Sequence, residues 1–265
     1  MTLSIAIGDF ADWSARIRAN LDAHYTPDFV DLSVADFDAY DVIIPLARRH
    51  AEALGRRPDL KGRKFLHPSP ETVALCHDKL ALTRFLIAEG FGDFVPPLRA
   101  PGAPYPYVWK RRQSAFGRDC HIVRGPEDER DLDPADPDWF AQVVAPAPIE
   151  YATHILRAGG KIHYVSSMTY QLAGPGLVLG QLNAPRAIRL DAGCPHLDIF
   201  AAILDRLDYE GVTCIDYKVE GGRPLIFEIN PRFGGSLCRD ATAFVEAYIG
   251  ALGPREPQAR GDASS

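Results

Sequence analysis

Alternation of apolar and polar residues is clearest in two adjacent stretches near the carboxyl end of the chain. In residues 213–219 and 225–229, apolar or β-branched residues alternate with polar ones, which is the pattern of half-buried strands. Gly221-Gly222 marks a turn between the two stretches. The pattern therefore predicts a β-hairpin, and on its second strand Glu228 and Asn230 leave the sheet on the same face.

Whether Asp216 joins that face depends on the register of the hairpin. A turn with an odd number of residues, such as Gly221-Gly222-Arg223, places Asp216 opposite Glu228, whereas a two-residue turn pairs it with Phe227 and turns it away. If the side chains converge, two carboxylates and an amide oxygen offer hard oxygen ligands for Mg²⁺ with phosphate, and Arg232 follows to meet an anion. An exposed hairpin with solvated charges is the other interpretation, but acids and amides are usually depleted in strands.

The amino-terminal region alternates between strand-like and helical patterns. Short apolar runs predict strands at residues 3–8, 29–32 and 41–46, and residues 12–21 have the period of an amphipathic helix. This alternation predicts a small Rossmann-like α/β unit. Its first turn, Gly8-Asp9-Phe10, lacks the G-x-G-x-x-G fingerprint of dinucleotide sites, so we expect a scaffold that contributes to an acceptor pocket.

Two helix starts follow this unit. Ser69-Pro70-Glu71 combines an N-cap serine, a proline at the first helical position and an acid in the first turn. A second helix is predicted to begin at Asp78 and to end at Gly90. Lys79 lies in its first turn, where a cation is unfavourable unless an anion binds nearby. Taken alone, Lys79 is better explained as a surface lysine than as an anion ligand.

The middle of the chain predicts a strand over residues 107–110, which carries Lys110. A loop of small and basic residues, 111–119, comes next and contains Ser114 and Gly117. Such a loop can fold its N–H groups over a triphosphate, although a basic hairpin turn is the usual explanation.

An apolar strand is then predicted over residues 139–144, and it breaks at the proline-containing residues 145–148. The strand and its break would present bare backbone groups to the edge of an adenine. Glu150 and His154 share one face of the strand that follows. Either could be an ordinary solvent-facing strand residue, and for His154 this is our expectation. Residues 241–252 predict a last helix.

Composition excludes several classes of function. The net charge is −6 without a basic stripe, which argues against a nucleic-acid partner. Five cysteines without a C-x-x-C pair fit free thiols in a reducing compartment. No stretch approaches the roughly 20 apolar residues of a membrane span, and the amino terminus does not read as a signal peptide. We therefore expect a cytoplasmic protein without a membrane partner, with a disordered polar tail.

Taken in order, these features resemble the ATP-grasp superfamily, in particular its biotin-carboxylase and carbamoyl-phosphate-synthase branch. The most specific element is the spacing of twelve residues from Asp216 to Glu228, then two to Asn230 and two to Arg232. The resemblance covers residues 79–236, about three-fifths of the chain. It implies an α/β (α+β) ATP-grasp fold, in which a Rossmann-like amino-terminal subdomain precedes two α+β subdomains that clasp ATP between them. The implied divisions are residues 1–77, 78–146 and 147–253, with the tail at 254–265.

The resemblance implies ATP as a cofactor. Lys79 and Lys110 would contact its phosphates, with Lys110 also approaching the adenine, and residues 114–117, from Ser114 to Gly117, would form a flexible flap. Glu150 would bond the ribose hydroxyls. The adenine hinge would be the backbone of three consecutive residues, Val143, Val144 and Ala145.

The resemblance also implies two Mg²⁺ ions, held by Asp216 and Glu228, with Asn230 on one of them. Arg232 and Lys110 would be catalytic, and Arg232 would steady the transferred phosphoryl group and an acyl phosphate. Asp216 stands where glutamate is commoner in the family, which shortens the reach to the metal.

The implied activity is an ADP-forming ligase that joins a small-molecule carboxylate, such as an amino acid, to an amine or a thiol. A carboxylate is a poor electrophile, and ATP would convert it to an acyl phosphate. Kinase-like transfer that stops at a phosphorylated product is one alternative, and a nucleotide-binding module without turnover is another. Residues 1–65 and 234–240 are expected to line the acceptor pocket, and a homodimer is a family expectation.

Overall fold

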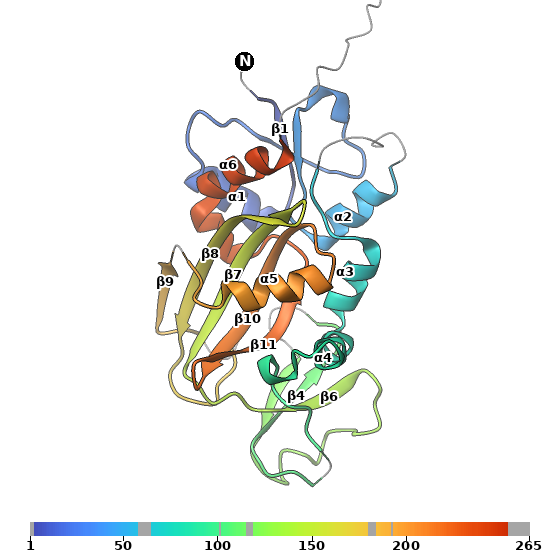
Figure 1. Cartoon of the computed structure of the whole chain (residues 1–265), viewed down its shortest axis with the longest axis vertical. Coiled ribbons are helices and arrows are strands. Elements are labelled where there is room, and N and C mark those ends of the chain that lie inside the picture. Colours follow the sequence, from blue (N-terminus) through green and yellow to red (C-terminus); the bar gives the residue numbers. More distant parts are fainter. Residues whose placement is uncertain are drawn as a thin grey trace, which may run out of the picture.

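The structure is a computed structural model of the 265-residue chain, and it describes residues 3–57, 65–100, 102–114, 119–179, 184–191 and 193–253. Three units follow one another along the long axis of the molecule (Figure 1). An amino-terminal α/β unit lies at one end, a five-stranded sheet lies in the middle, and a small three-stranded sheet lies at the other end. The predicted tail lies outside the described residues.

The amino-terminal unit contains the strands and the helix that the sequence predicts. Its elements are β1 (Ile5–Gly8), α1 (Ala11–Asn20), β2 (Asp28–Val30), η1 (Phe37–Ala39), β3 (Val42–Ile44) and α2 (Arg48–Gly55). The strands are parallel in the order β2-β1-β3, as in a Rossmann-like unit. All of β1 and β3 is buried, because both faces of a parallel sheet are covered, and this explains their uninterrupted apolar runs.

Two helices connect this unit to the rest of the chain. They are α3 (Pro70–His77) and α4 (Lys79–Ala88). The Ser69 hydroxyl accepts an amide N–H in the first turn of α3, and the Asp78 carboxylate accepts two in the first turn of α4. A glycine with a positive φ of 87°, Gly90, follows α4, as the sequence predicts.

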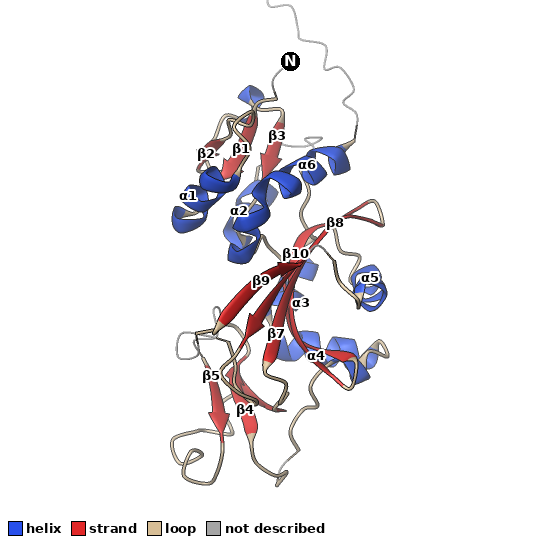
Figure 2. Cartoon of the chain, turned by 90° about the vertical axis from the view of Figure 1, so that its left-hand side faces the viewer, coloured by secondary structure: helices blue, strands red, loops and turns tan. Residues whose placement is uncertain are grey.

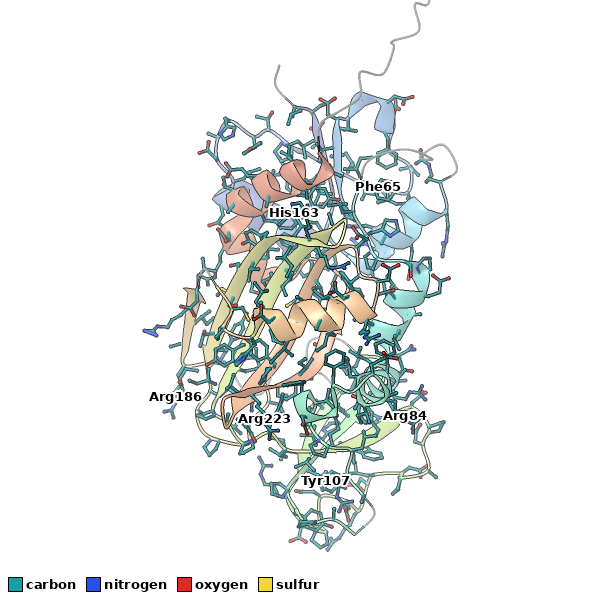
Figure 3. The ribbon with its side chains drawn as sticks, in the orientation of Figure 1. Phe65, Arg84, Tyr107, His163, Arg186 and Arg223 are labelled. Atoms are coloured by element: carbon teal, nitrogen blue, oxygen red, sulfur yellow. The ribbon has the colours of Figure 1, made fainter. Side chains whose placement is uncertain are left out.

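The small sheet has the strand order β5-β4-β6 and is antiparallel. Its strands are β4 (Tyr107–Arg111), β5 (Cys120–Val123) and β6 (Trp139–Val143), and a short helix, η3 (Gly92–Phe94), precedes them. Strand β5 was not predicted. Tyr107, which Figure 3 labels, packs with Trp109 and Val123 on one face, which leaves Val108 and Lys110 on the other.

The central sheet is antiparallel in the order β11-β10-β7-β8-β9. Its strands are β7 (Ile149–Ala158), β8 (Lys161–Gln171), β9 (Ala187–Asp191), β10 (Gly211–Glu220) and β11 (Arg223–Asn230). Helix α5 (Leu197–Arg206) covers one face, where its Phe200 packs in a core with Ile155 and Ile215. Residues of the opposite parity, such as His154 and Asp216, therefore lie on the other face.

The last helix returns the chain to the amino-terminal unit (Figure 1). It is α6 (Ala241–Leu252), it matches the predicted range, and it follows η4 (Gly235–Asp240). The buried Tyr248 hydroxyl donates to the Ile43 carbonyl at 3.0 Å and accepts from the Leu66 amide at 2.7 Å. One apolar core runs from β1 and α1 through Phe244 to the central sheet, so the two units are packed together rather than only linked.

None of the helices in the described part of the chain is long and apolar enough to cross a membrane.

Candidate functional site

A β-bulge decides which way Asp216 faces. Gly221 and Gly222 form a two-residue turn, since Glu220 pairs with Arg223, so of the two alternatives the structure has the shorter turn. The register of a two-residue turn holds as far as the pair Tyr217 and Ile226, and then Phe227 is an extra residue, so that Asp216 pairs with Glu228. The bulge supplies the odd residue that the turn does not, and it places both carboxylates on one face.

Asp216, Glu228 and Asn230 converge on that face. The Asn230 amide nitrogen donates to Asp216 Oδ2 at 2.9 Å and to Glu228 Oε1 at 3.0 Å. The Arg232 guanidinium donates to Asn230 Oδ1 at 3.2 Å and to the Phe233 carbonyl at 3.0 Å. The three predicted oxygen-bearing side chains and the arginine thus form one hydrogen-bonded cluster.

The two carboxyl groups have opposite proton affinities. Burial and repulsion by Glu228 raise the pKa of Asp216 well above its usual range. Burial also works against ionisation of Glu228, but Lys79 and the hydrogen bonds from Asp216 and Asn230 outweigh it and hold the pKa at about 2. One proton is therefore kept on Asp216 beside an ionised Glu228, and a divalent cation at this place would displace it.

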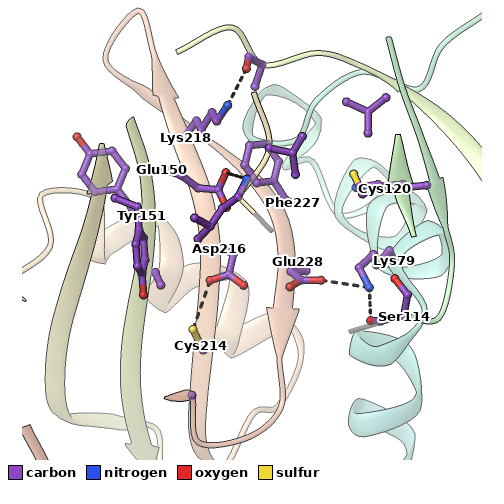
Figure 4. Close-up of a pocket in the computed structure, with 18 of the residues that line it drawn as sticks. Lys79, Ser114, Cys120, Glu150, Tyr151, Cys214, Asp216, Lys218, Phe227 and Glu228 are labelled. Carbon is purple, nitrogen blue, oxygen red and sulfur yellow. Dashed lines mark hydrogen bonds and ion pairs between the residues drawn. The ribbon is translucent and has the colours of Figure 1, made fainter. Parts of the chain in front are cut away.

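Lys79 lies inside the site and not on an open surface. Its ammonium is 3.1 Å from Glu228 Oε2 and donates to the Ser114 carbonyl at 2.7 Å, as Figure 4 shows. Its side chain is only 12% exposed, so the explanation as a surface lysine does not hold. Ser114 presents its backbone oxygen here, and Gly117, the other predicted flap residue, lies outside the described residues.

Lys110 is a desolvated cation on the inner face of the small sheet. It is 7% exposed, and its ammonium lies 5.1 Å from the centre of the Phe140 ring. Burial lowers the pKa of Lys110 to about 8, and burial raises the pKa of the Cys120 thiol, its neighbour on β5, to about 11. A buried cation of this kind is stabilised when an anion binds beside it.

Glu150 faces a lysine that the sequence reasoning missed. Lys218 pairs with Glu150 in the register of β7 and β10 and is 2% exposed. Its ammonium donates to the Ala145 carbonyl at 3.2 Å, the contact of Lys218 that Figure 4 marks, and also to the Leu177 carbonyl. Burial raises the pKa of Glu150 to about 7, against the attraction of Lys218. The signal was available, because Lys218 stands two residues from Asp216 and so shares its face.

The connector between β6 and β7 is less free than expected. Val143, Val144 and Ala145 all line the pocket. However, the Val143 N–H donates to the Pro97 carbonyl at 2.9 Å, and the Ala145 carbonyl already accepts from Lys218. The expectation that this backbone is bare is therefore wrong for these two groups.

His154 is not solvent-facing, and that expectation is wrong. It is fully buried, and its Nε2 lies 2.7 Å from the Ser236 hydroxyl. Burial and the nearby Arg232 lower its pKa to about 3, so the ring is neutral. A Cβ at Gly234 would stand 2.4 Å from His154 Cε1. The segment after β11 folds over this end of the sheet face, which the strand period could not reveal.

Most of these side chains, though not Asn230 and His154, line one pocket of about 530 Å³. Its lining comes from all three units: Trp13 and Arg16 of α1, Lys110 and Gln142 of the small sheet, and Glu150, Asp216, Lys218 and Glu228 of the central sheet. The site thus combines a partly buried acid pair and arginine with buried lysines. Such an arrangement can hold polyphosphate charge and strengthen its electrostatic interactions.

The oxygen-bearing side chains of the site fit a Mg²⁺ ion that is bound by only a few protein ligands. No cluster of three or more acidic, histidine or cysteine side chains that could hold a metal is found among the residues that the structure places. Asp216 and Glu228, with the Asn230 amide between them, provide two carboxylates and one amide oxygen. Mg²⁺ is commonly bound by one or two carboxylates together with substrate phosphates, and this set suits that mode.

Known proteins resemble this chain in structure and not in sequence. No protein-family model matches it, and no curated protein matches its sequence. Solved structures do match. The D-alanine–D-alanine ligase of Bacillus anthracis is 14% identical, with 95% of this chain and 97% of that one covered, at a TM-score of 0.62.

Two further structures match to a similar degree. The L-amino acid ligase of Bacillus licheniformis is 15% identical, with 95% of this chain and 74% of that one covered, at a TM-score of 0.62. The N5-carboxyaminoimidazole synthetase of Staphylococcus aureus, solved with ADP, is 13% identical, with 97% and 79% covered, at a TM-score of 0.60. At these identities the likeness is one of fold.

Proposed function

Because this chain has the ATP-grasp fold, we propose that it is an ADP-forming ligase that joins a small-molecule carboxylate to an amine or a thiol through an acyl phosphate. The observation that carries the proposal is the hydrogen-bonded cluster of Asp216, Glu228, Asn230 and Arg232, in which the two acids and the arginine line the pocket. A fold alone does not specify a reaction, whereas an acid pair beside an arginine and buried lysines has a definite chemistry.

The activities named for the similar structures support this choice. The Bacillus and Staphylococcus proteins are a D-alanine–D-alanine ligase, an L-amino acid ligase and an N5-carboxyaminoimidazole synthetase. The D-alanine–D-alanine ligase was also solved with ATP, and the synthetase with ADP. We infer ATP as the cofactor of this chain from that likeness and from the cations that line its pocket.

The lysines and the connector would hold the nucleotide. Lys79 and Lys110 would neutralise phosphate charge, and Lys110 would regain in the complex the stabilisation that burial removes. We place the ribose hydroxyls at Glu150 and the adenine at the connector that contains Val144, with residues 114–117 as a flap. Because Lys218 fixes the Ala145 carbonyl, the connector is preorganised before the nucleotide binds.

Asp216 and Glu228 would hold Mg²⁺, with Asn230 contributing its amide oxygen. Bound Mg²⁺ supplies charge neutralisation to the transferred phosphoryl group. The residues of this chain must first release the proton that Asp216 keeps and the hydrogen bonds that Asn230 makes to both acids. Loading of the site is therefore coupled to proton release.

The reaction would proceed in two steps. A substrate carboxylate oxygen attacks the γ-phosphorus, and ADP leaves; the amine nitrogen then attacks the acyl carbon, phosphate leaves, and the amine gives up a proton. Arg232, which also donates to the Phe233 carbonyl, is placed to steady the phosphoryl group in both steps when Asn230 turns its oxygen to the metal. The buried pocket would protect the acyl phosphate from water.

The test is ADP release over pairs of small carboxylates and amines, with products identified by mass spectrometry. We expect ADP only when both substrates are present, and a loss of roughly a hundredfold or more in Asp216→Ala with nucleotide binding retained. Asp198→Ala, an exposed acid of α5 on the opposite face, is the matched control and should keep full activity.

Two results would count against the ligase. ADP formed with a carboxylate alone, together with a stable phosphorylated product, would indicate a kinase. A protein that binds nucleotide but releases no ADP with any pair of substrates, and whose Asp216→Ala variant behaves in the same way, would be a binding module.

A further inference from the structure

The pocket has a second end that the nucleotide does not explain. The amino-terminal unit and the small sheet lie at opposite ends of the central sheet (Figure 2), and the pocket is lined by residues of both. At the amino-terminal end the wall is α1. Trp13 and Arg16 are three residues apart on this helix, so they share one side of it, and both line the pocket.

Trp13 presents an unpaired donor at this end. The residue is 6% exposed, its ring stacks on Phe10 at 4.3 Å, and the Arg232 guanidinium carbon lies 5.6 Å from its centre. Within the described residues the indole N–H has no hydrogen-bond partner. A buried indole N–H usually finds an acceptor, and an unpaired one that faces a pocket indicates a ligand.

Arg16 presents an unpaired cation beside it. Among the residues that the structure describes, its guanidinium has no ion pair and no hydrogen-bond acceptor. The other cations of the central site differ in this respect, since Lys79 contacts Glu228 and Lys218 contacts two carbonyls. None of the pocket acids forms an ion pair with Arg16.

Gly235 keeps the space over these two donors open. A Cβ at this position would stand 2.9 Å from Trp13 Nε1 and 3.6 Å from Arg16 Nη1. Both donors therefore point over the same short stretch of backbone, next to Arg232. The two side-chain nitrogens that face Gly235, the Trp13 indole and the Arg16 guanidinium, can only donate hydrogen bonds, and one of them is a cation, so the ligand group that fits them is an anion.

We propose that the carboxylate substrate carries a second anionic group, a carboxylate or a phosphate, which Trp13 and Arg16 bind while the reacting carboxylate lies at Arg232. The proposal rests on the proposed ligase function and adds the class of its acid substrate. A neutral side chain would leave the indole N–H of the buried Trp13 without an acceptor and would lose the attraction of Arg16, which is exposed at the edge of the pocket, so neutral and anionic near-isosteres should be distinguished.

The experiment is isothermal titration calorimetry of the full-length protein with matched acidic and neutral amino acids. The probes are L-glutamate against L-glutamine and L-aspartate against L-asparagine, with O-phospho-L-serine as the phosphate arm. We expect at least one anionic probe to bind tenfold or more tightly than its neutral counterpart. Arg16→Gln should reduce that preference by roughly three- to tenfold, because Arg16 is exposed, and Trp13→Phe should reduce it several-fold.

Arg18→Gln is the matched control, because Arg18 is on the same helix but lies over the Phe29 ring at 4.2 Å and does not line the pocket. It should leave the preference unchanged. Equal binding of acidic and neutral probes by the unaltered protein would overturn the proposal. So would an Arg16→Gln variant that weakens both members of a pair equally, or a failure of every anionic probe to bind.

The two proposals fail separately in this design. If the acidic preference depends on Arg16 but no pair of substrates releases ADP, the anion site stands and the ligase function falls. If neutral carboxylates give ADP and Arg16→Gln changes neither their kcat/KM nor the acidic preference, the ligase stands and the anion site falls.

Discussion

At the scale of single residues, the site is organised by carboxyl groups that differ in proton affinity. Glu228 is ionised because Lys79 and its hydrogen bonds outweigh burial, whereas burial and repulsion keep a proton on Asp216. Glu150, nearer the connector, has a pKa raised to about 7. In the free protein, burial therefore makes ionisation of Asp216 and Glu150 unfavourable, and bound cations would stabilise their ionised forms.

The Glu150 carboxyl should give the free protein a recognisable pH dependence. Burial raises its pKa from 4.5 to about 7, so the folded state holds this proton more tightly than the unfolded state does. Below pH 4.5 the group is protonated in both states and contributes nothing. As the pH rises from 4.5 to 7, the free energy of unfolding falls by about 2–3 kcal/mol on account of this group alone.

Glu150→Gln should remove that contribution. Urea unfolding of both proteins at several values between pH 5 and pH 8 measures it. We expect the free energy of unfolding of the variant to increase relative to that of the unaltered protein as the pH rises. The loss of the attraction between Glu150 and Lys218 shifts the variant by an amount that does not produce this trend with pH. A difference that stays flat across the range would contradict the assignment.

At the scale of elements, the segment after β11 owes its path to a glycine. Gly234 lies so close to the His154 ring that no side chain fits between them, and Ser236 then reaches the ring nitrogen at 2.7 Å. This contact holds Gly235 and Arg232 in the pocket wall. One backbone approach thus connects the acid pair on β11 with the amino-terminal end of the pocket.

Gly234→Ala should therefore destabilise the protein through a clash with the His154 ring. The new methyl group would meet His154 Cε1 at 2.4 Å, and we expect a loss of about 1–3 kcal/mol in unfolding free energy with a lower rate of ADP release. In a double-mutant cycle, His154→Ala should recover part of that loss, because the clash is with this ring. Gly250→Ala, at an exposed position of α6 with open space around it, is the control and should be neutral or stabilising. Strict additivity of the two substitutions would exclude the contact as the cause.

At the scale of the whole molecule, a continuous core joins the amino-terminal unit to the central sheet through α6. Tyr248 is the polar part of this junction, since its hydroxyl joins the Ile43 carbonyl to the Leu66 amide. The divisions at residues 77 and 146, the homodimer and the cytoplasmic location stay predictions. The packing nevertheless places α1 close enough to the site to line its pocket.

Tyr248→Phe tests that junction. It keeps the ring but leaves a buried carbonyl and a buried amide without their partner, so we expect a loss of about 1–3 kcal/mol in unfolding free energy. Urea unfolding followed by circular dichroism measures the loss, and the denaturant dependence should stay unchanged. Tyr40→Phe, whose hydroxyl makes one exposed contact with Asp28, should have little effect. Equal effects of the two substitutions would argue against the buried junction.

Much of this fold follows from local pattern. The strands of the amino-terminal unit, the capped helices after Ser69 and Asp78, and the range of α6 are all set by periodicity and by end signals that neighbouring residues carry. The sequence also indicated the face shared by Glu228 and Asn230. It could not fix the side taken by Asp216, because a bulge depends on how two strands pair and not on either strand alone.

The burial of His154 and the contacts of Lys218 were not predicted for the same reason: they depend on residues distant in the sequence. His154 has the pattern of an exposed strand residue, and only the return of the segment after β11 buries it. Lys218 was readable from its position two residues after Asp216, but its buried contacts with two carbonyls depend on where the connector runs. Local periodicity determines the face of a residue, whereas long-range packing determines what covers it.

The extra residue at Phe227 also determines which changes in the length of the hairpin tip leave the acid pair in place. From the turn back to the pair Tyr217–Ile226, the strands pair as in an ordinary two-residue hairpin. The register shifts by one residue only beyond that pair, on the side of the two acids. Trimming or extending the tip by one residue on each strand, or grafting an epitope in place of Gly221-Gly222, should leave both carboxylates where they are. An unpaired insertion would have to be absorbed by the turn, or one acid would cross to the opposite layer. The tip is thus a natural position for length variation and for labels.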